Sequence, residues 1–189
     1  MGEGDMTKDE LVREVERLRA RLAALSAGGG GGNDVAYHDA VTGLYNRGAF
    51  FTLALQQFRL ASRKNRPMLL LMCDLKGLAH INEAEGQDAG DEALRRVAQL
   101  LKHTYREADI VARVGADEFT VLALEATAAH ENLLASRLRR RLAELREETG
   151  KSDDLSMRIW VVRWDPAEPC TVKELLDKAE DHLRVDSGS

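Results

Sequence analysis

The feature that most constrains the fold is an apolar run, Met68–Cys73, that ends directly in an acid, Asp74. A run of this length, bounded by polar residues, indicates a buried strand. Further along the chain, the segment 113–119 predicts a β-hairpin that carries Asp117 and Glu118 at its tip. Carboxylates that converge from two adjacent strands are what a site for Mg²⁺ and a nucleotide needs.

The composition allows one domain of ordinary size plus an appendage, because the chain has 189 residues, of which 44% are apolar. The formal charge of −5 argues against a general nucleic-acid binder, whose surface is usually basic. Cys73 falls in the predicted buried strand, far in sequence from Cys170, so we expect two reduced thiols. The sequence shows no signal peptide or membrane-spanning run. We therefore expect a cytoplasmic protein whose partners include neither a nucleic-acid polymer nor a membrane.

Residues 1–27 predict a helix that forms a coiled coil. The segment 7–10, Thr-Lys-Asp-Glu, is a capping box. The apolar residues behind it follow the spacing of a heptad seam, and they are Leu11, Val15, Leu18, Leu22 and Leu25. We prefer a parallel homodimer, in which Glu14 reaches Arg19 of a partner helix. The repeat covers only about two and a half heptads, so an amphipathic helix lying on its own domain remains the alternative.

A run of five glycines, Gly28–Gly32, separates this helix from the rest of the chain. We expect residues 28–35 to be a flexible linker, which is either native or a cloning remnant. Residues 36–189 then form the single folded domain.

The pattern from residue 36 onward predicts an α/β unit with the element order α-β-α-β-β-α-β-α. Asn46 and Asp91 are placed to cap helices, with a loop over 86–90 before the second. We expect helices over 46–64, from 91 onward, over 128–148 and over 171–185, and strands over 67–75, 109–114, 118–124 and 155–164. This order favours a ferredoxin-like sheet with central antiparallel strands and helices on its faces.

Two segments upstream of the hairpin also carry patterns of chemistry. Segment 39–47, Asp-Ala-Val-Thr-Gly-Leu-Tyr-Asn-Arg, reads physically as a turn followed by a helix N-cap. Segment 74–91 places a carboxylate at a strand end beside a glycine-rich loop, which suits a cation and a phosphate. Asn82 and Asp91 suit the polar edge of a guanine. Taken alone, an ordinary strand–loop–helix with Asp91 as a cap is the simpler explanation.

In register, these segments resemble the GGDEF family, the diguanylate cyclases. Segment 39–47 is similar to the family's opening D-x-[LV]-T-G-L-x-N-R, and segment 74–91 to its D-x-D-x-F-K-x-x-N-D-x-x-G-H-x-x-G-D. The hairpin 115–119 is similar to the signature, with Ala116 in place of the second glycine. The resemblance covers residues 36–185 and is strong up to residue 119. It implies a nucleotide-cyclase-like sheet, GTP as substrate, and Mg²⁺ or Mn²⁺ as cofactor.

The resemblance implies roles for the acids. Asp74 and Asp117 would be metal ligands, with the carbonyl of Leu75 beside them. Asp117 would also help to deprotonate the 3′-hydroxyl of the substrate, and Glu118 would be the supporting acid.

It also implies residues that bind the substrate. Asn82 and Asp91 would read the guanine, while Gly115 and Ala116 would lie close to the phosphates. If position 116 has a positive φ, alanine there costs about 1 kcal/mol, and its methyl group crowds the nucleotide.

Other positions depart from the family pattern. The replacements in segment 74–91 are Lys76 for Asp, Leu78 for Phe, Ala79 for Lys, Glu83 for Asp and Gln87 for His. Loss of a phosphate-facing lysine at position 79 costs about 2–4 kcal/mol of binding or barrier. The strand 155–162 carries bulky residues where the family has S-x-G, and the last helix lacks the Tyr and the second phosphate-binding lysine.

Arg106 and Asp109 stand three residues apart, at a predicted helix end and strand start. Taken alone, the pair is a surface ion pair worth about 0–1 kcal/mol. In the family, an R-x-x-D five residues before the signature is the inhibitory site for cyclic di-GMP, and the spacing here matches. An arginine both stacks on guanine and pairs with phosphate. Arg137, beside the basic run 139–141, is a further candidate contact.

These observations favour a cyclic di-GMP signalling protein that binds GTP, cyclic di-GMP or both, and is weak or inactive as a cyclase. The first alternative is a competent dimeric cyclase that condenses two GTP molecules and is inhibited by its product. The second is a non-catalytic scaffold that interacts with a protein effector.

Overall fold

The computed structural model describes residues 36–149, 155–168 and 170–175. The predicted N-terminal coiled coil, the glycine linker and most of the C-terminal helix lie outside the described residues. Within the described ranges, no helix is both long and apolar enough to cross a membrane.

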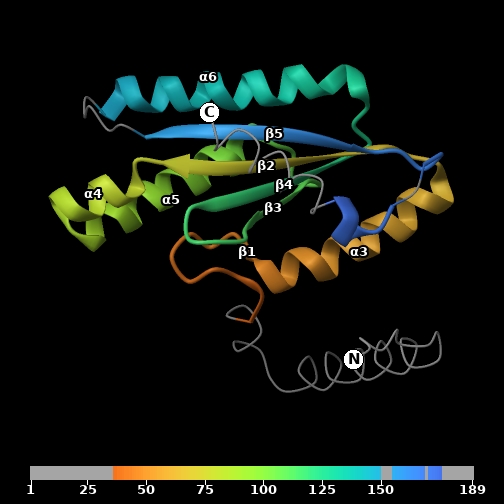
Figure 1. Ribbon diagram of the computed structural model, residues 1–189, viewed down its shortest axis with the longest axis horizontal. Helices are drawn as coiled ribbons and strands as arrows, with labels where there is room; N and C mark the ends of the chain where they lie inside the picture. Colours follow the sequence, from red (N-terminus) through yellow and green to blue (C-terminus); the bar gives the residue numbers. More distant parts are fainter. Residues whose placement is uncertain (1–35, 150–154, 169, 176–189) are drawn as a thin grey trace, which may run out of the picture. The chain divides into compact units, whose positions relative to one another are not determined.

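A five-stranded sheet with the order β1-β3-β4-β2-β5 forms the centre of the domain (Figure 1). Its strands are β1 (Tyr45–Asn46), β2 (Met68–Lys76), β3 (Ile110–Arg113), β4 (Glu118–Leu124) and β5 (Ser156–Trp164). Strand β1 pairs with β3 in parallel, and every other pair is antiparallel. The predicted antiparallel centre is therefore confirmed. Strand β2 is buried along all but its last residue, because it lies between β4 and β5 and both of its faces are covered.

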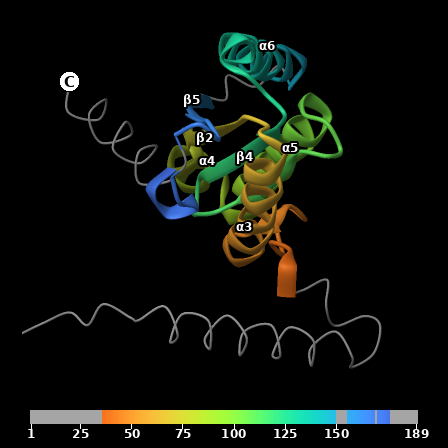
Figure 2. The ribbon, with the colours of Figure 1, turned by 90° about the vertical axis from the view of Figure 1, so that its right-hand side faces the viewer.

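Helices cover the two faces of this sheet. They are α3 (Arg47–Lys64), α4 (Leu78–Glu85), α5 (Gln87–Thr104) and α6 (Glu131–Thr149), with a short 3-10 turn, η1 (Ala128–His130), before α6. One core cluster joins α5 and α6 to the sheet, and a second joins α3 to its other face. The sheet accordingly lies between α6 and α3 in Figures 1 and 2.

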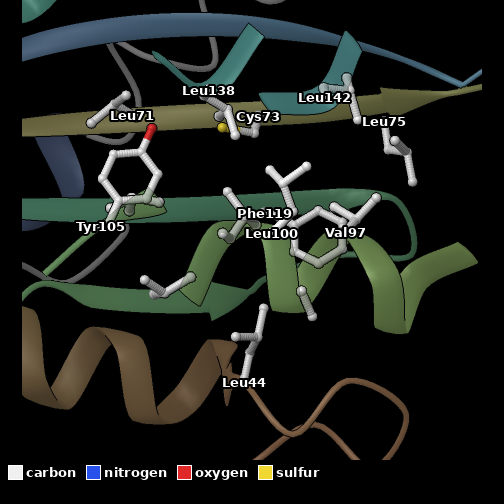
Figure 3. Packing of buried hydrophobic residues seen from close by; sticks show 14 of the residues in the cluster. Leu44, Leu71, Cys73, Leu75, Val97, Leu100, Tyr105, Phe119, Leu138 and Leu142 are labelled. Carbon is white, nitrogen blue, oxygen red and sulfur yellow. The ribbon is translucent and has the colours of Figure 1, made fainter. Parts of the chain in front are cut away.

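The α5–α6 face is packed by aliphatic side chains from both helices and the strands (Figure 3). Leu138 and Leu142 of α6 and Val97 of α5 meet Cys73 and Phe119 of the sheet in this cluster. These side chains are all under a tenth exposed. Successive residues of β2 therefore pack alternately into the two core clusters, one on each face of the sheet, and this explains its unbroken apolar run.

Local capping signals set the first long helix where the sequence predicts it. The side chain of Asn46 accepts a hydrogen bond from the backbone N–H of Ala49 at 2.9 Å, and α3 ends at Asn65 in the left-handed conformation. Phe58 of α3 then packs on Trp164 of β5, with ring centroids 5.0 Å apart.

The prediction of a loop over 86–90 followed by a helix from Asp91 is wrong. Helix α5 begins at Gln87, and Gly90 is buried inside it. The break between α4 and α5 is at Gly86, where φ is +90°. A Cβ at Gly90 would collide with the side-chain amide of Asn82 in α4. Gly90 thus permits a close approach of two helices rather than a loop.

Candidate functional site

The predicted acids of the sheet lie together at one end of β2 and β4. Asp74 and Glu118 are direct partners in the antiparallel register of these strands. The backbone N–H of Leu75 donates a 2.8 Å hydrogen bond to the carbonyl of Asp117. The register therefore brings residues from two separate motifs into one cluster, as the pattern of strand and hairpin predicts.

Arg113, which the sequence analysis did not single out, holds the hairpin tip. Its guanidinium donates to the carbonyls of Gly115 at 3.2 Å and Ala116 at 2.7 Å. It also donates to the carboxylate of Asp39 at 3.1 Å. The same carboxylate oxygen accepts the backbone N–H and the hydroxyl of Thr42, at 2.9 and 2.7 Å. The side chain of Arg113, which is 13% exposed, thus ties segment 39–47 to the hairpin, in addition to the pairing of β1 with β3.

This network also fixes the ionisation of Asp39. Burial raises the pKa of its carboxyl, but the hydrogen bonds from Thr42 and Arg113 outweigh that effect and hold the pKa below its usual value. Asp39 is therefore a charged anchor for the loop and the hairpin.

Ala116 is exposed and does not have a positive φ. The backbone strain considered for an alanine at this position therefore does not arise. The constraint falls on its neighbour instead, because a Cβ at Gly115 would collide with the carboxylate of Glu118. A side chain at position 115 would require the carboxylate of Glu118 to move.

The two predicted guanine-reading residues are brought close together by the packing of α4 on α5. Asn82, on the exposed side of α4, lies against Gly90, and Asp91 follows Gly90 directly in α5. Asn82 is exposed and Asp91 is half-buried, one residue beyond the point of contact. This arrangement fits a polar ligand edge that needs both a donor and an acceptor.

Asp74, only 6% exposed, is engaged by two cations. Arg158, its direct partner in the register of β2 and β5, donates from Nε at 3.1 Å and from Nη2 at 2.5 Å to Oδ2 of the acid. Lys76 places Nζ 2.8 Å from the same oxygen. The guanidinium also lies over the ring of Trp160, 5.3 Å from its centroid. In the sequence alone, this strand stands out only for its bulky residues.

The implied metal ion can be tested against these contacts. Across the described ranges, no group of three or more His, Cys, Asp or Glu side chains is placed to hold a metal. Two positive charges already lie on Asp74 and would repel a divalent cation at the same carboxylate. The residues around Asp74 therefore do not fit the ion, and the metal roles of Asp74, Leu75 and Asp117 stay a prediction from resemblance.

The R-x-x-D pair lies at the other end of β4. Asp109 accepts the backbone N–H of Arg106 at 2.9 Å and that of Leu124 at 3.0 Å, one on each carboxylate oxygen. No ion pair joins the two motif side chains in the described part of the chain, so the surface ion-pair alternative is not what forms. Asp109 instead fastens the turn before β3 to the end of β4.

Arg106 and Arg137 line one small pocket. Its cavity is about 60 Å³, and Asp109 and His130 also contribute to its walls. Both arginines are exposed, although they come from different elements: Arg106 follows α5, and Arg137 belongs to α6. The structure thus brings together the three residues predicted for the inhibitory site.

The sheet order, the acids at the end of β2 and the tight hairpin define a nucleotide-cyclase-like domain. A family model described as "Diguanylate cyclase, GGDEF domain" matches residues 36–186. The chain therefore belongs to the GGDEF domain family.

Curated relatives agree with this assignment. The cyclic di-GMP phosphodiesterase NbdA of Pseudomonas aeruginosa is 31% identical over 138 residues, which are 72% of this chain and 18% of NbdA. The diguanylate cyclase DosC of Escherichia coli is 30% identical over 121 residues, which are 64% of this chain and 26% of DosC. The chain thus spans about a fifth to a quarter of the length of these relatives.

Solved structures show the same fold. The GGDEF domain of TpbB (YfiN) from Pseudomonas aeruginosa matches at 29% identity with a TM-score of 0.70, over 78% of this chain and 87% of that one. The GGDEF domain of DgcB from Caulobacter crescentus, in complex with c-di-GMP, matches at 18% identity with a TM-score of 0.68, over 80% of this chain and 88% of that one. The diguanylate cyclase SiaD of Pseudomonas aeruginosa, in complex with its activator SiaC, matches at 21% identity with a TM-score of 0.72, over 95% of this chain and 68% of that one. The last two are likenesses of fold alone.

Proposed function

We propose that this domain is a cyclic di-GMP receptor that binds the dinucleotide through Arg106, Asp109 and Arg137, and that turns GTP over slowly or not at all. The observation that carries the proposal is that the two residues of R-x-x-D have different roles. Both carboxylate oxygens of Asp109 accept backbone N–H groups, and these hydrogen bonds fix the turn from which Arg106 projects. Because the guanidinium of Arg106 forms no ion pair with any described residue, it is available to a ligand.

The arginines of the pocket suit that ligand. Arg106 and Arg137 stand there with two acids, Asp109 and Glu125, of which the first accepts backbone N–H groups and the second pairs with Arg66. A cyclic dinucleotide offers two phosphates for ion pairing and two guanine planes for stacking on guanidinium groups. The cavity is small and lies beside the two exposed arginines, so we infer that it seats one base or phosphate while the rest of the dinucleotide lies across them.

Slow turnover follows from the other end of the sheet. Asp74 is engaged by Arg158 and Lys76, and Ala79 stands where the family pattern has a phosphate-facing lysine. Without that lysine, the developing charge on the phosphates loses one stabilising partner.

The alternative is a competent cyclase, and the pairing of Asp74 with Glu118, next to the backbone of Asp117, favours it. That enzyme would need a divalent cation on these acids and two domains face to face, each holding one GTP. A homodimer through the N-terminal helix would supply the local concentration. In either case we propose a cytoplasmic protein that signals to a protein effector; one solved relative is bound to an activator protein.

Calorimetry with cyclic di-GMP and with GTP tests the proposal. We expect Arg106→Ala to abolish binding of cyclic di-GMP and to leave GTP binding within about threefold, which is under 1 kcal/mol. Arg140→Ala is the matched control, because Arg140 lies on α6 with Arg137 but pairs with Glu144 instead. Equal loss of both ligands in Arg106→Ala would mean one shared site. Failure of the unmodified chain to bind cyclic di-GMP would refute the receptor function.

A further inference from the structure

We propose that Arg158, with Lys76, takes the place of a divalent cation on Asp74, and that this end of the sheet binds nucleotide phosphates without a metal. The inference concerns the β2–β5 end of the sheet and does not depend on what the R-x-x-D pocket binds. Those two places lie at opposite ends of β4, which spans Glu118–Leu124 and is therefore about 20 Å long.

The geometry of Arg158 and Asp74 shows that the arginine acts as the counter-ion of the buried acid. Arg158 is held opposite Asp74 by the strand register itself, so its side chain needs no loop to position it. Two of its nitrogens reach one oxygen of the acid, and the Trp160 ring supports the guanidinium plane. A strand residue fixed on three sides in this way is pre-organised for Asp74.

Burial makes the pairing obligatory. The side chain of Asp74 is 9% exposed, so its charge requires compensation by a nearby positive group. A bound metal would provide it in one arrangement, and Arg158 with Lys76 provides it in this chain. The two solutions exclude each other, because a divalent ion at hydrogen-bond distance from a guanidinium and an ammonium is strongly repelled.

The net charge of the cluster changes the ligand that it can take. Asp74, Asp117 and Glu118 stand against Lys76 and Arg158, which leaves the cluster at −1. An acid at position 76, as in the family pattern, and a neutral residue at 158 would leave it at −4. This cluster therefore carries much less negative charge than one with the family pattern, and it attracts a divalent ion less strongly.

The cations are also accessible from outside. Lys76 is 44% exposed and Arg158 is 33% exposed, whereas the acid between them is covered. Lys76 directly precedes Gly77, which has a φ of +93° and is the N-cap of helix α4. Exposed cations beside a glycine turn and the backbone N–H groups of a helix start are a suitable surface for phosphate oxygens.

The test is to titrate GTP into the full chain in EDTA and in excess MgCl₂, and to titrate Mn²⁺ alone by electron paramagnetic resonance. We expect the two GTP affinities to agree within about threefold and no Mn²⁺ to bind. In Arg158→Ser, we expect metal-free GTP binding to weaken at least about tenfold and Mn²⁺ binding to emerge at the uncovered acid. Arg163→Ser is the matched control, because Arg163 is exposed on the same strand but pairs in register with Leu69.

A second variant keeps the inference testable if Arg158→Ser does not fold. Asp74→Asn retains an oxygen for Arg158 and leaves both cations in the chain, so it should still bind GTP in EDTA. The inference is overturned by GTP binding that requires Mg²⁺, by no GTP binding in EDTA, or by Mn²⁺ binding that Asp74→Asn removes. Cyclic di-GMP affinity should be unchanged in each variant. If the unmodified chain does not bind cyclic di-GMP, that result would refute only the receptor function.

Discussion

Asp109 offers a sharp test of the structure, because its carboxylate accepts two backbone N–H groups from different elements. A hydrogen bond to a charged acceptor contributes about 1.5–3 kcal/mol, with the lower end expected where water can replace it. Asp109→Ala removes both bonds and should lower the free energy of unfolding by about 3 kcal/mol. Asp109→Asn keeps one oxygen acceptor and should cost about half as much.

Urea denaturation followed by circular dichroism measures these losses, with Glu107→Gln as a control at an exposed position of the same turn. Cyclic di-GMP affinity should fall in parallel with stability, because a loosened turn no longer positions Arg106. A different outcome would refute the reasoning: if Asp109→Ala unfolds at the same urea concentration as the unmodified chain, Asp109 does not fasten the turn. Its motif role would then be direct contact with the ligand.

Three further predictions follow from other parts of the chain. Deleting residues 1–33 should convert a dimer to a monomer in sedimentation velocity, and a monomeric full chain at micromolar concentration would contradict the coiled coil. Ala116→Gly should change cyclase turnover by less than about threefold, because φ at this position is not positive and no strain is relieved. Ala79→Lys should raise turnover by a larger factor. A tenfold gain from Ala116→Gly alone would contradict this prediction. Burial raises the pKa of the Cys73 thiol to about 12, so a disulfide reagent at pH 8 should label half-buried Cys170 first and Cys73 only on unfolding; rapid labelling of both thiols in the native state would refute that burial.

The parts of the fold that the sequence predicts well are those that depend on neighbouring residues. The cap at Asn46 and the capping box of Thr171 with Glu174 both form, the latter with three hydrogen bonds of 2.7 to 3.1 Å. The strand over 68–76 follows from an unbroken apolar run, since only a strand covered on both faces needs one. In each case the signal and the structure lie within one short window.

The start of α5 and the edge strand β1 could not be predicted in this way. Glycine at position 90 resembles a loop residue, and its true reason lies in the side chain of Asn82 on another helix. Strand β1 has only two residues, Tyr45 and Asn46, and it exists because β3 offers a free edge to pair with. Both features depend on tertiary contacts that no local pattern records.

The roles of Arg113 and Arg158 were missed for a related reason. Arg113 reaches an acid 74 positions away, and Arg158 reaches one 84 positions away. A basic residue in a strand has no local sign of its partner, and the partner follows only from the register. The register of β2 with β5 was not part of the prediction, because strand order was inferred only as an antiparallel centre.

The placement of the two motifs explains how one can change without the other. The acid cluster begins β4 and the R-x-x-D turn is fastened to its end, with the buried residues of the strand between them. Cations that neutralise Asp74 act over a few ångströms in a partly solvated edge, and their effect is screened well before it reaches Arg106. The proposed binding of a dinucleotide at the far end would therefore depend on the turn and the strand and not on the chemistry of the near end. On this reasoning, a domain that has lost a metal-based cyclase site can still serve as a receptor.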